Sequence, residues 1–250
     1  MEIANISTDH IAYIAGGLLG DFFSQLSVIK EYYIKYNKKG LLYISDIKCS
    51  FRNPETIGKL ETVYAQTYDI IKNQDYIYDY KLYKGERYNV DLSSWRGNSL
   101  LFKTNFYEIY KSEYNIDWGK HKWIDMPHDN KWKNTVLITT VTYRHKNYIN
   151  YNQYMLKYPD FKFIFISIDK GDYDFFISDT KQTNIDYYCP ENMFDTIVAI
   201  NSCEFFMGTT SGLLCMAYSM HKKSITVDSP SSMDNLLHSN MHFLNTSYTY

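Results

Sequence analysis

The chain lacks the features that mark several large classes of protein. Its 250 residues contain no run of about 18 apolar residues, the length that a membrane-spanning helix needs. The N-terminus has no basic segment leading into a long apolar stretch, so we expect neither a secretory signal nor a membrane span. The formal net charge is -2 and no basic tail is present, which argues against a nucleic-acid partner.

Cysteine is scarce, and its spacing excludes the common zinc sites. No two cysteines form a C-x-x-C pair, and no histidine stands at ligand spacing from one. We therefore expect no metal site. Scattered cysteines in a chain of this length are typical of reduced thiols, which predicts a cytoplasmic location. The four cysteines are Cys49, Cys189, Cys203 and Cys215.

Alternating strand and helix patterns fill the N-terminal half. An apolar strand over 10–15 is followed by an amphipathic helix over 21–36 and a strand over 41–46, with Gly40 as the expected C′ residue of the helix. Strand, helix and strand in about 35 residues predict a βαβ unit with parallel strands. The pattern continues with a helix over 54–71, a strand over 76–83 and a helix near 99–112.

The alternation restarts in the C-terminal half, after a tryptophan-rich stretch over 86–133 that has no clear period. This change predicts two Rossmann-like parallel-sheet domains, 1–130 and 131–250, which face a cleft. In such α/β folds, ligands bind beyond the carboxyl ends of the strands. The expected strands are 134–143, 162–169, 204–208 and 224–229, and the expected helices are 148–159, a short one at 172–177, 190–203 and one that follows a turn within 209–223.

The first glycine-rich turn, "AGGLLGD" (15–21), joins a strand to a helix. Gly16, Gly17 and Gly20 let backbone N–H groups approach a ligand, beside the positive end of the helix. Two roles stay open for Asp21. The spacing fits a helix N-cap, and the position at a cleft fits a general base that takes a proton from a hydroxyl.

A second turn, within "MGTTSGLLCMA" (207–217), also joins a strand to a helix. Gly208 ends the strand, and Thr209, Thr210 and Ser211 offer hydroxyls and backbone donors before Gly212. This pattern is typical of an anion site that holds a phosphate. The alternative is a Ser/Thr capping turn in which Gly212 allows tight packing. The chain contains neither G-x-G-x-x-G nor G-x-S-x-G, which argues against a dinucleotide oxidoreductase and a nucleophile-elbow hydrolase.

Both turns carry a resemblance to a known family. The stretches "LLGDFFSQLSVI" and "INSCEFFMGTTSGLLCMAYSMHKKSITVDSP" resemble the N- and C-terminal signatures of the heptosyltransferase-like glycosyltransferases of family 9. The chain also looks like short glycosyltransferase-like proteins of large DNA viruses and some bacteria, which would place it in the host cytoplasm if it is viral. The resemblance implies a GT-B fold with an acceptor side in the N-terminal half and a nucleotide-sugar side in the C-terminal half.

The resemblance also implies roles for individual residues. Asp21 matches the catalytic base and Gly20 the glycine before it, while Gly208, Ser211 and Gly212 match the turn that binds the donor phosphates. Thr210 stands where the family has Asp, and Cys215 stands where it has His. The implied function is metal-independent, inverting transfer of a sugar from a nucleotide-sugar to a glycan or protein hydroxyl. The alternative is a binding module for glycans or nucleotides that has lost the chemistry.

Other residues have weaker signals. Arg144 follows the strand over 134–143, and two roles stay open for it: its guanidinium neutralises a leaving diphosphate, or it lies on a solvated loop. Glu191 opens the expected helix over 190–203, where a carboxylate binds the hydroxyls of a ribose, although acids are also common there as capping residues. In the stretch over 91–106, Trp95, Arg96 and Lys103 either line the acceptor side or are a core tryptophan and surface charges.

Overall fold

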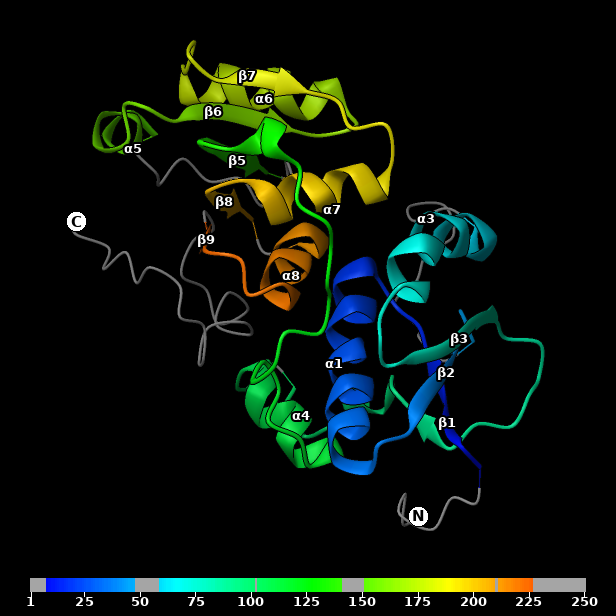
Figure 1. Ribbon diagram of the computed structural model, residues 1–250. Helices are drawn as coiled ribbons and strands as arrows, with labels where there is room; N and C mark the ends of the chain where they lie inside the picture. Colours follow the sequence, from blue (N-terminus) through cyan, green and yellow to red (C-terminus); the bar gives the residue numbers. More distant parts are fainter. Residues whose placement is uncertain (1–7, 48–58, 102, 141–150, 210, 227–250) are drawn as a thin grey trace. The chain divides into compact units, whose positions relative to one another are not determined.

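The chain forms two compact units, each built on its own parallel sheet (Figure 1). The structure is a computed structural model and describes residues 8–47, 59–101, 103–140, 151–209 and 211–226. The chain passes from the first unit to the second between Asp125 and Met126. No helix among these residues is long and apolar enough to cross a membrane.

The first unit holds a sheet of four strands in the order β3-β2-β1-β4, and every pair in it is parallel. Its elements are β1 (His10–Ala15), α1 (Leu19–Tyr36), β2 (Lys39–Ile44), α3 (Leu60–Lys72), β3 (Ile77–Leu82), β4 (Val90–Asp91), the 3-10 turn η2 (Ser94–Gly97) and α4 (Phe106–Tyr114).

The second unit holds a sheet of five strands in the order β7-β6-β5-β8-β9, again all parallel. Its elements are η3 (Asn130–Trp132), β5 (Thr135–Thr139), α5 (Tyr151–Lys157), β6 (Lys162–Ile166), α6 (Lys170–Thr180), β7 (Asp186–Tyr188), α7 (Met193–Ser202), β8 (Phe205–Gly208), α8 (Gly212–Ser219) and β9 (Ser224–Thr226).

Each sheet reverses its strand order beside its first strand. In the first unit the chain builds outward from β1 through β2 to β3, and then returns to place β4 on the other side of β1. The second unit does the same, with β6 and β7 on one side of β5 and β8 and β9 on the other. Such topological switch points are where open α/β sheets bind ligands, beyond the carboxyl ends of the strands. The predicted α/β class with two parallel sheets is confirmed.

Helix α1 packs closely against β2, and this contact explains Gly40. A Cβ atom on Gly40 would lie 2.4 Å from Cγ2 of Ile29, so only glycine fits the strand against the helix. The sequence interpretation of Gly40 as the C′ residue of the helix is wrong. Asn37 ends α1 instead, in the left-handed conformation with φ of 54°, because Asn tolerates that region better than most side chains.

The tryptophan-rich stretch supplies core residues. Trp95, Trp118 and Trp123 are buried in the first unit and Trp132 in the second. Trp118 Nε1 donates to the carbonyl of Ser24 at 3.1 Å, and Trp123 Nε1 donates to the carbonyl of Phe23 at 2.8 Å. These bonds tie the segment after α4 to the helix that carries Asp21. The aperiodic pattern therefore reflects packing of an irregular segment, which periodicity does not detect.

Two helices begin later than the sequence predicted, because an asparagine caps each one. Asn105 accepts from the backbone N–H of Glu108, so α4 begins at Phe106 and not near 99. Asn192 accepts from the N–H of Asp195, so α7 begins at Met193 and not at 190. Side-chain caps of this kind stabilise a helix start by about 1 kcal/mol.

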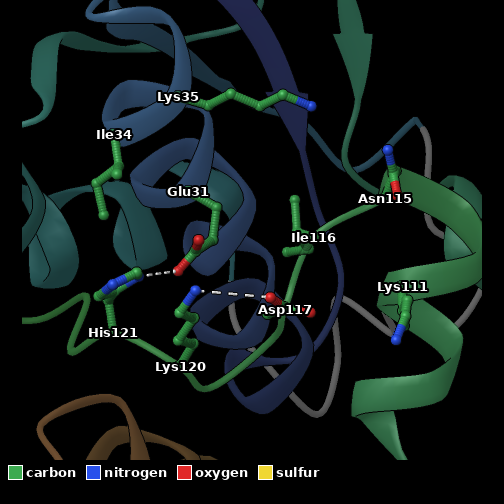
Figure 2. Close-up of a pocket in the computed structure, with 9 residues that line it drawn as sticks. All are labelled: Glu31, Ile34, Lys35, Lys111, Asn115, Ile116, Asp117, Lys120 and His121. Carbon is green, nitrogen blue, oxygen red and sulfur yellow. Dashed lines mark hydrogen bonds and ion pairs between the residues drawn. The ribbon is translucent and has the colours of Figure 1, made fainter.

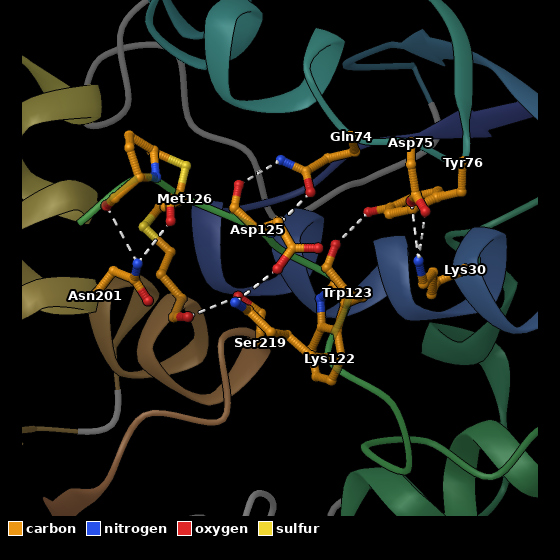
Figure 3. A network of polar contacts seen from close by, with 12 residues as sticks. Lys30, Gln74, Asp75, Tyr76, Lys122, Trp123, Asp125, Met126, Asn201 and Ser219 are labelled. Carbon is orange, nitrogen blue, oxygen red and sulfur yellow. Dashed lines mark hydrogen bonds and ion pairs between the residues drawn. The ribbon is translucent and has the colours of Figure 1, made fainter.

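Polar contacts hold the chain on both sides of the point where the units divide (Figure 3). In the first unit, Gln74 Nε2 donates to the carbonyl of Asp125 at 3.1 Å, and Asp125 N donates to Gln74 Oε1 at 2.8 Å. In the second unit, Asn201 Nδ2 donates to the carbonyls of Met126 and Pro127 at 2.8 and 3.2 Å. Each unit therefore fixes its own end of the connection.

Candidate functional site

The first glycine turn follows β1 at the switch point of the first unit. Gly17 has a φ of 109°, a backbone conformation that favours glycine. Gly20 lies inside the first turn of α1, where its carbonyl accepts from Ser24 Oγ at 2.7 Å. The helix begins after Leu18, and no side chain caps it there. Its first N–H groups are therefore directed at the carboxyl edge of the sheet.

Gln25 holds this turn in place, which the sequence interpretation missed. Its buried side chain lies one helical turn beyond Asp21 on α1. Gln25 Nε2 donates to the carbonyl of Gly16 at 3.0 Å, and Gly16 N donates to Gln25 Oε1 at 3.3 Å. The amide thus satisfies both backbone groups of a buried glycine. A glutamine after a glycine-rich turn is the only sequence signal for it, and that signal is not specific.

Asp21 is the third residue of α1, with 8% of its surface exposed. It is therefore not the N-cap, and that interpretation of the sequence is wrong. A carboxylate in the first turn of a helix is stabilised by the partial positive charge of the helix N-terminus. Asp21 also forms an ion pair, between its Oδ2 and Nη2 of Arg96. The two side chains are 11% and 20% exposed, so water screens the pair only partly.

Arg96 reaches Asp21 from η2, the short turn that follows β4. Because β4 pairs with β1, the loops after both strands leave the same edge of the sheet. The guanidinium carbon of Arg96 lies 4.2 Å from the centroid of the Trp95 ring, a cation–π contact. Trp95 is buried, which confirms the core alternative for it, whereas Arg96 lies at the site. Lys103 is exposed.

The second glycine turn follows β8 at the switch point of the second unit. Gly208 pairs with Thr139 at the end of β5, and Thr209 N donates to the carbonyl of Thr139 at 3.3 Å. A Cβ atom on Gly208 would lie 2.6 Å from the ring of Phe206, so packing requires glycine here. Thr209 is fully buried, and Thr210 lies outside the described residues.

The N-terminus of α8 is the open part of this turn. Ser211 occupies the N-cap position with an extended backbone, and its side chain makes no capping hydrogen bond. Ser211 and Gly212 are partly exposed. An uncapped helix start of this kind offers N–H groups and partial positive charge to an anion. Cys215, one turn further on, has a buried side chain and therefore does not contribute to this surface.

Of the two other residues predicted for the donor side, the structure describes Glu191 alone. Glu191 precedes α7 and is exposed, and its backbone N–H donates to Asp195 Oδ2 at 3.2 Å. The expectation that Glu191 lies in the first turn of the helix is wrong, because Asn192 caps α7. Asp195 is the acid in that turn, and it also accepts from the hydroxyl of Tyr188 at 2.6 Å. Arg144 lies outside the described residues.

A hollow of about 360 Å³ in the first unit lies between α1 and the segment after α4 (Figure 2). His121 Nδ1 lies 2.7 Å from Glu31 Oε1 and joins the segment to α1, and Lys120 Nζ lies 3.7 Å from Asp117 Oδ2 within the segment. It contains none of the predicted site residues. Its lining residues are Glu31, Ile34, Lys35, Lys111, Asn115, Ile116, Asp117, Lys120 and His121. Within the described ranges, no group of three or more His, Cys, Asp or Glu residues is placed to hold a metal ion.

The sequence comparisons find no match, whereas comparison with solved structures finds proteins that share the fold. No family model and no curated protein matches the chain. A family 9 glycosyltransferase from Veillonella parvula shares the fold with a TM-score of 0.60 at 10% identity, over 94% of this chain and 86% of that one. E. coli heptosyltransferase WaaC, solved with ADP, gives 0.60 at 7% identity, over 91% and 89%.

A third solved structure agrees with these two. The E. coli ADP-heptose LPS heptosyltransferase II gives a TM-score of 0.54 at 11% identity, over 92% of this chain and 88% of that one. Identities this low establish the fold alone. The chain has a GT-B-like α/β fold, with two sheets each made of parallel strands, and it shares this fold with the heptosyltransferases of glycosyltransferase family 9.

Proposed function

We propose that the chain is a glycosyltransferase that moves a sugar from a nucleotide-sugar donor to a hydroxyl of a glycan or protein. In this proposal the first unit binds the acceptor and the second binds the donor. One observation carries the proposal: each glycine turn lies at the switch point of its own parallel sheet and leads into a helix without a side-chain cap. The WaaC structure solved with ADP supports a nucleotide as part of the ligand.

Asp21 is the base in this proposal. As the acceptor oxygen bonds to the anomeric carbon of the donor sugar, its proton passes to the Asp21 carboxylate. The bond between that carbon and the diphosphate breaks, and the diphosphate leaves with the electron pair. The attack and departure occur on opposite faces of the sugar, so the anomeric configuration inverts.

The open end of the second glycine turn, at Ser211 and Gly212, holds the leaving diphosphate in this proposal. Negative charge grows on the diphosphate as its bond to the sugar breaks, and the N–H groups at the start of α8 stabilise that charge. Arg144 adds a guanidinium after β5, the strand that neighbours β8. Glu191 binds the ribose hydroxyls. In this proposal these groups bind the donor and stabilise the leaving diphosphate without a metal ion.

A second candidate function is a binding module for glycans or nucleotides that carries out no transfer. The burial of Cys215 favours it, because this residue stands where the family has His and offers no polar group to a donor. The two functions share the donor turn and differ in whether Asp21 acts on an acceptor.

A thermal-shift screen of the purified protein against ADP, UDP, GDP, CMP and their sugars tests the proposal. A nucleotide at a hundred times its dissociation constant adds about 2.7 kcal/mol to the stability of the folded state. We expect one nucleotide to stabilise the protein, and transfer of its sugar to follow in an acceptor assay. Stabilisation without transfer would favour the binding module. No stabilisation by any of them would contradict the proposed transfer and leave a glycan-binding module as the remaining candidate.

Ser211→Asp locates the binding at the donor turn. Aspartate is a good N-cap, so the variant keeps or slightly raises the melting temperature without ligand. A carboxylate about 5 Å from a diphosphate charge costs about 3 kcal/mol per charge at an effective dielectric of about 20, so the nucleotide shift disappears. Asn105→Asp, which makes a similar N-cap change at α4 in the first unit, is the matched control and keeps the shift.

A further inference from the structure

The ion pair between Arg96 and Asp21 joins two turns that lie 75 residues apart in sequence, at one switch point. We propose that Arg96 is a positioning residue for the transfer reaction, which holds the Asp21 carboxylate charged and in a fixed orientation at the acceptor side. This inference rests on the proposed function. It adds to that function a residue that acts on the reaction through Asp21.

The surroundings of Arg96 hold its guanidinium in place. The Trp95 ring beneath it packs edge-on against Phe106, with centroids 5.3 Å apart, and tilted against Tyr110 at 5.7 Å. Trp95 N also donates to the hydroxyl of Tyr114 at 3.3 Å. A planar guanidinium on a buried aromatic ring loses little further freedom when it pairs with a carboxylate.

The same hydroxyl connects the η2 turn to the strand before it. Tyr114 OH donates to the carbonyl of Asp91 at 3.2 Å and accepts from Ser94 Oγ at 3.1 Å. Burial raises the pKa of Tyr114 far above its usual value of about 10, so this hydroxyl stays protonated and keeps donating over any working pH. The turn that carries Arg96 is therefore anchored by a hydrogen bond that does not titrate there.

The charge of Arg96 has a chemical effect as well as a geometric one. A base must be deprotonated before it accepts a proton, and a guanidinium beside a carboxylate favours its ionised form. Asp91 is a further carboxylate at this edge, and its Oδ1 accepts from Ser93 N at 2.9 Å. Asp91 and Tyr114 are therefore hydrogen-bonded to residues at the start of η2, while Arg96 extends from the same turn to Asp21. Without Arg96, the Asp21 carboxylate binds a proton at a higher pH and is then unable to act as a base.

The test compares Arg96→Gln and Arg96→Lys with the wild type in the full-length protein. Because a misplaced base affects the chemical step, we expect Arg96→Gln to lower kcat on the order of 100-fold with little change in the donor KM. In the pH profile of kcat, the acidic limb of Arg96→Gln lies roughly 1 to 3 pH units higher than that of the wild type. Arg96→Lys keeps the charge without the planar fork, so it keeps the wild-type limb but recovers only part of kcat.

Two controls separate this role from a loss of folding. Arg87→Gln changes an exposed arginine of the same unit and leaves kcat and the pH profile unchanged. A double-mutant cycle with Asp21→Asn needs no activity: Arg96→Gln lowers the melting temperature more in the wild type than in the Asp21→Asn background. Equal losses in both backgrounds would show that the pair makes no contribution, and would overturn the inference.

The outcomes distinguish this inference from the proposed function. If the wild type transfers sugar and Arg96→Gln keeps both kcat and the acidic limb, the inference is wrong and the proposed function stands. If Arg96→Gln lowers kcat but leaves the limb in place, Arg96 is merely structural and the inference is again wrong. If the wild type binds no nucleotide sugar and transfers none, the proposed function fails, and the positioning role of Arg96 in transfer fails with it.

Discussion

The amide of Gln25 gives a test of what holds the first glycine turn. It makes two hydrogen bonds to the backbone of Gly16, and both residues are buried. Gln25→Met replaces the amide with a side chain of similar size and flexibility, so the volume is kept and the hydrogen bonds are lost. The change therefore isolates the polar contribution of this side chain.

The expected cost follows from the groups left behind. Leaving one buried donor or acceptor unpaired costs about 1–3 kcal/mol. The substitution leaves both the N–H and the carbonyl of Gly16 without Gln25, and the bond to the N–H is long at 3.3 Å. We therefore expect a loss of about 2–4 kcal/mol in the free energy of unfolding of the first unit.

Urea unfolding followed by tryptophan fluorescence measures this loss. Three of the four tryptophans, Trp95, Trp118 and Trp123, are buried in the first unit, so the signal reports mainly on it. Gln66→Met is the matched control, because Gln66 is exposed on α3 in the same unit; it changes stability by less than about 0.5 kcal/mol. If Gln25→Met costs no more than this control, Gln25 does not support the turn.

Two further stability predictions concern the same unit. Gly40→Ala forces a methyl group against Ile29 and lowers stability by about 1–3 kcal/mol, measured by urea unfolding. An unchanged unfolding midpoint would show that α1 moves aside without loss of stability. Burial raises the pKa of Asp79, but hydrogen bonds from Lys72 and Lys81 outweigh it and lower the pKa to about 2. The contribution of ionised Asp79 to stability is thus complete above its pKa in the unfolded chain, about 3.9, and is lost as pH falls through about 2. Asp79→Asn destabilises by no more than about 1 kcal/mol at pH 7. In a pH series, the difference in melting temperature between the wild type and Asp79→Asn should close near pH 2. A difference that persists there would contradict this assignment.

Local patterns in the sequence predicted most of the regular elements. The strands β1, β2, β6 and β8 fall where apolar runs placed them, because buried parallel strands have continuous apolar sequences. Strand β3 falls where an alternating pattern placed it. The two-residue strand β4 has no such pattern. It is defined by pairing with Tyr13 and Ile14 of β1, a contact across more than 75 residues that no local signal carries.

The same limit applies to the candidate site. The spacing of glycines predicted where the two turns lie, because a strand followed by glycines and a helix is a local pattern. It did not predict that Asp21 pairs with Arg96, because that contact depends on β4 lying beside β1 and not beside β3. Nor did it predict the amide of Gln25 on Gly16, since a helical glutamine has the same local signature whether buried or exposed.

The placement of β4 beside β1 has a consequence for the order in which the first unit assembles. A nascent chain that has reached β3 already contains three adjacent parallel strands, the glycine turn and Asp21. Val90, Asp91 and Arg96 are still missing at that stage, and joining β4 to β1 then closes a loop of more than 70 residues. The entropy of closing such a loop delays the contact. The carboxylate of Asp21 therefore acquires its counter-ion late in folding, so a species arrested at β3 has native-like secondary structure but lacks the ion pair at Asp21.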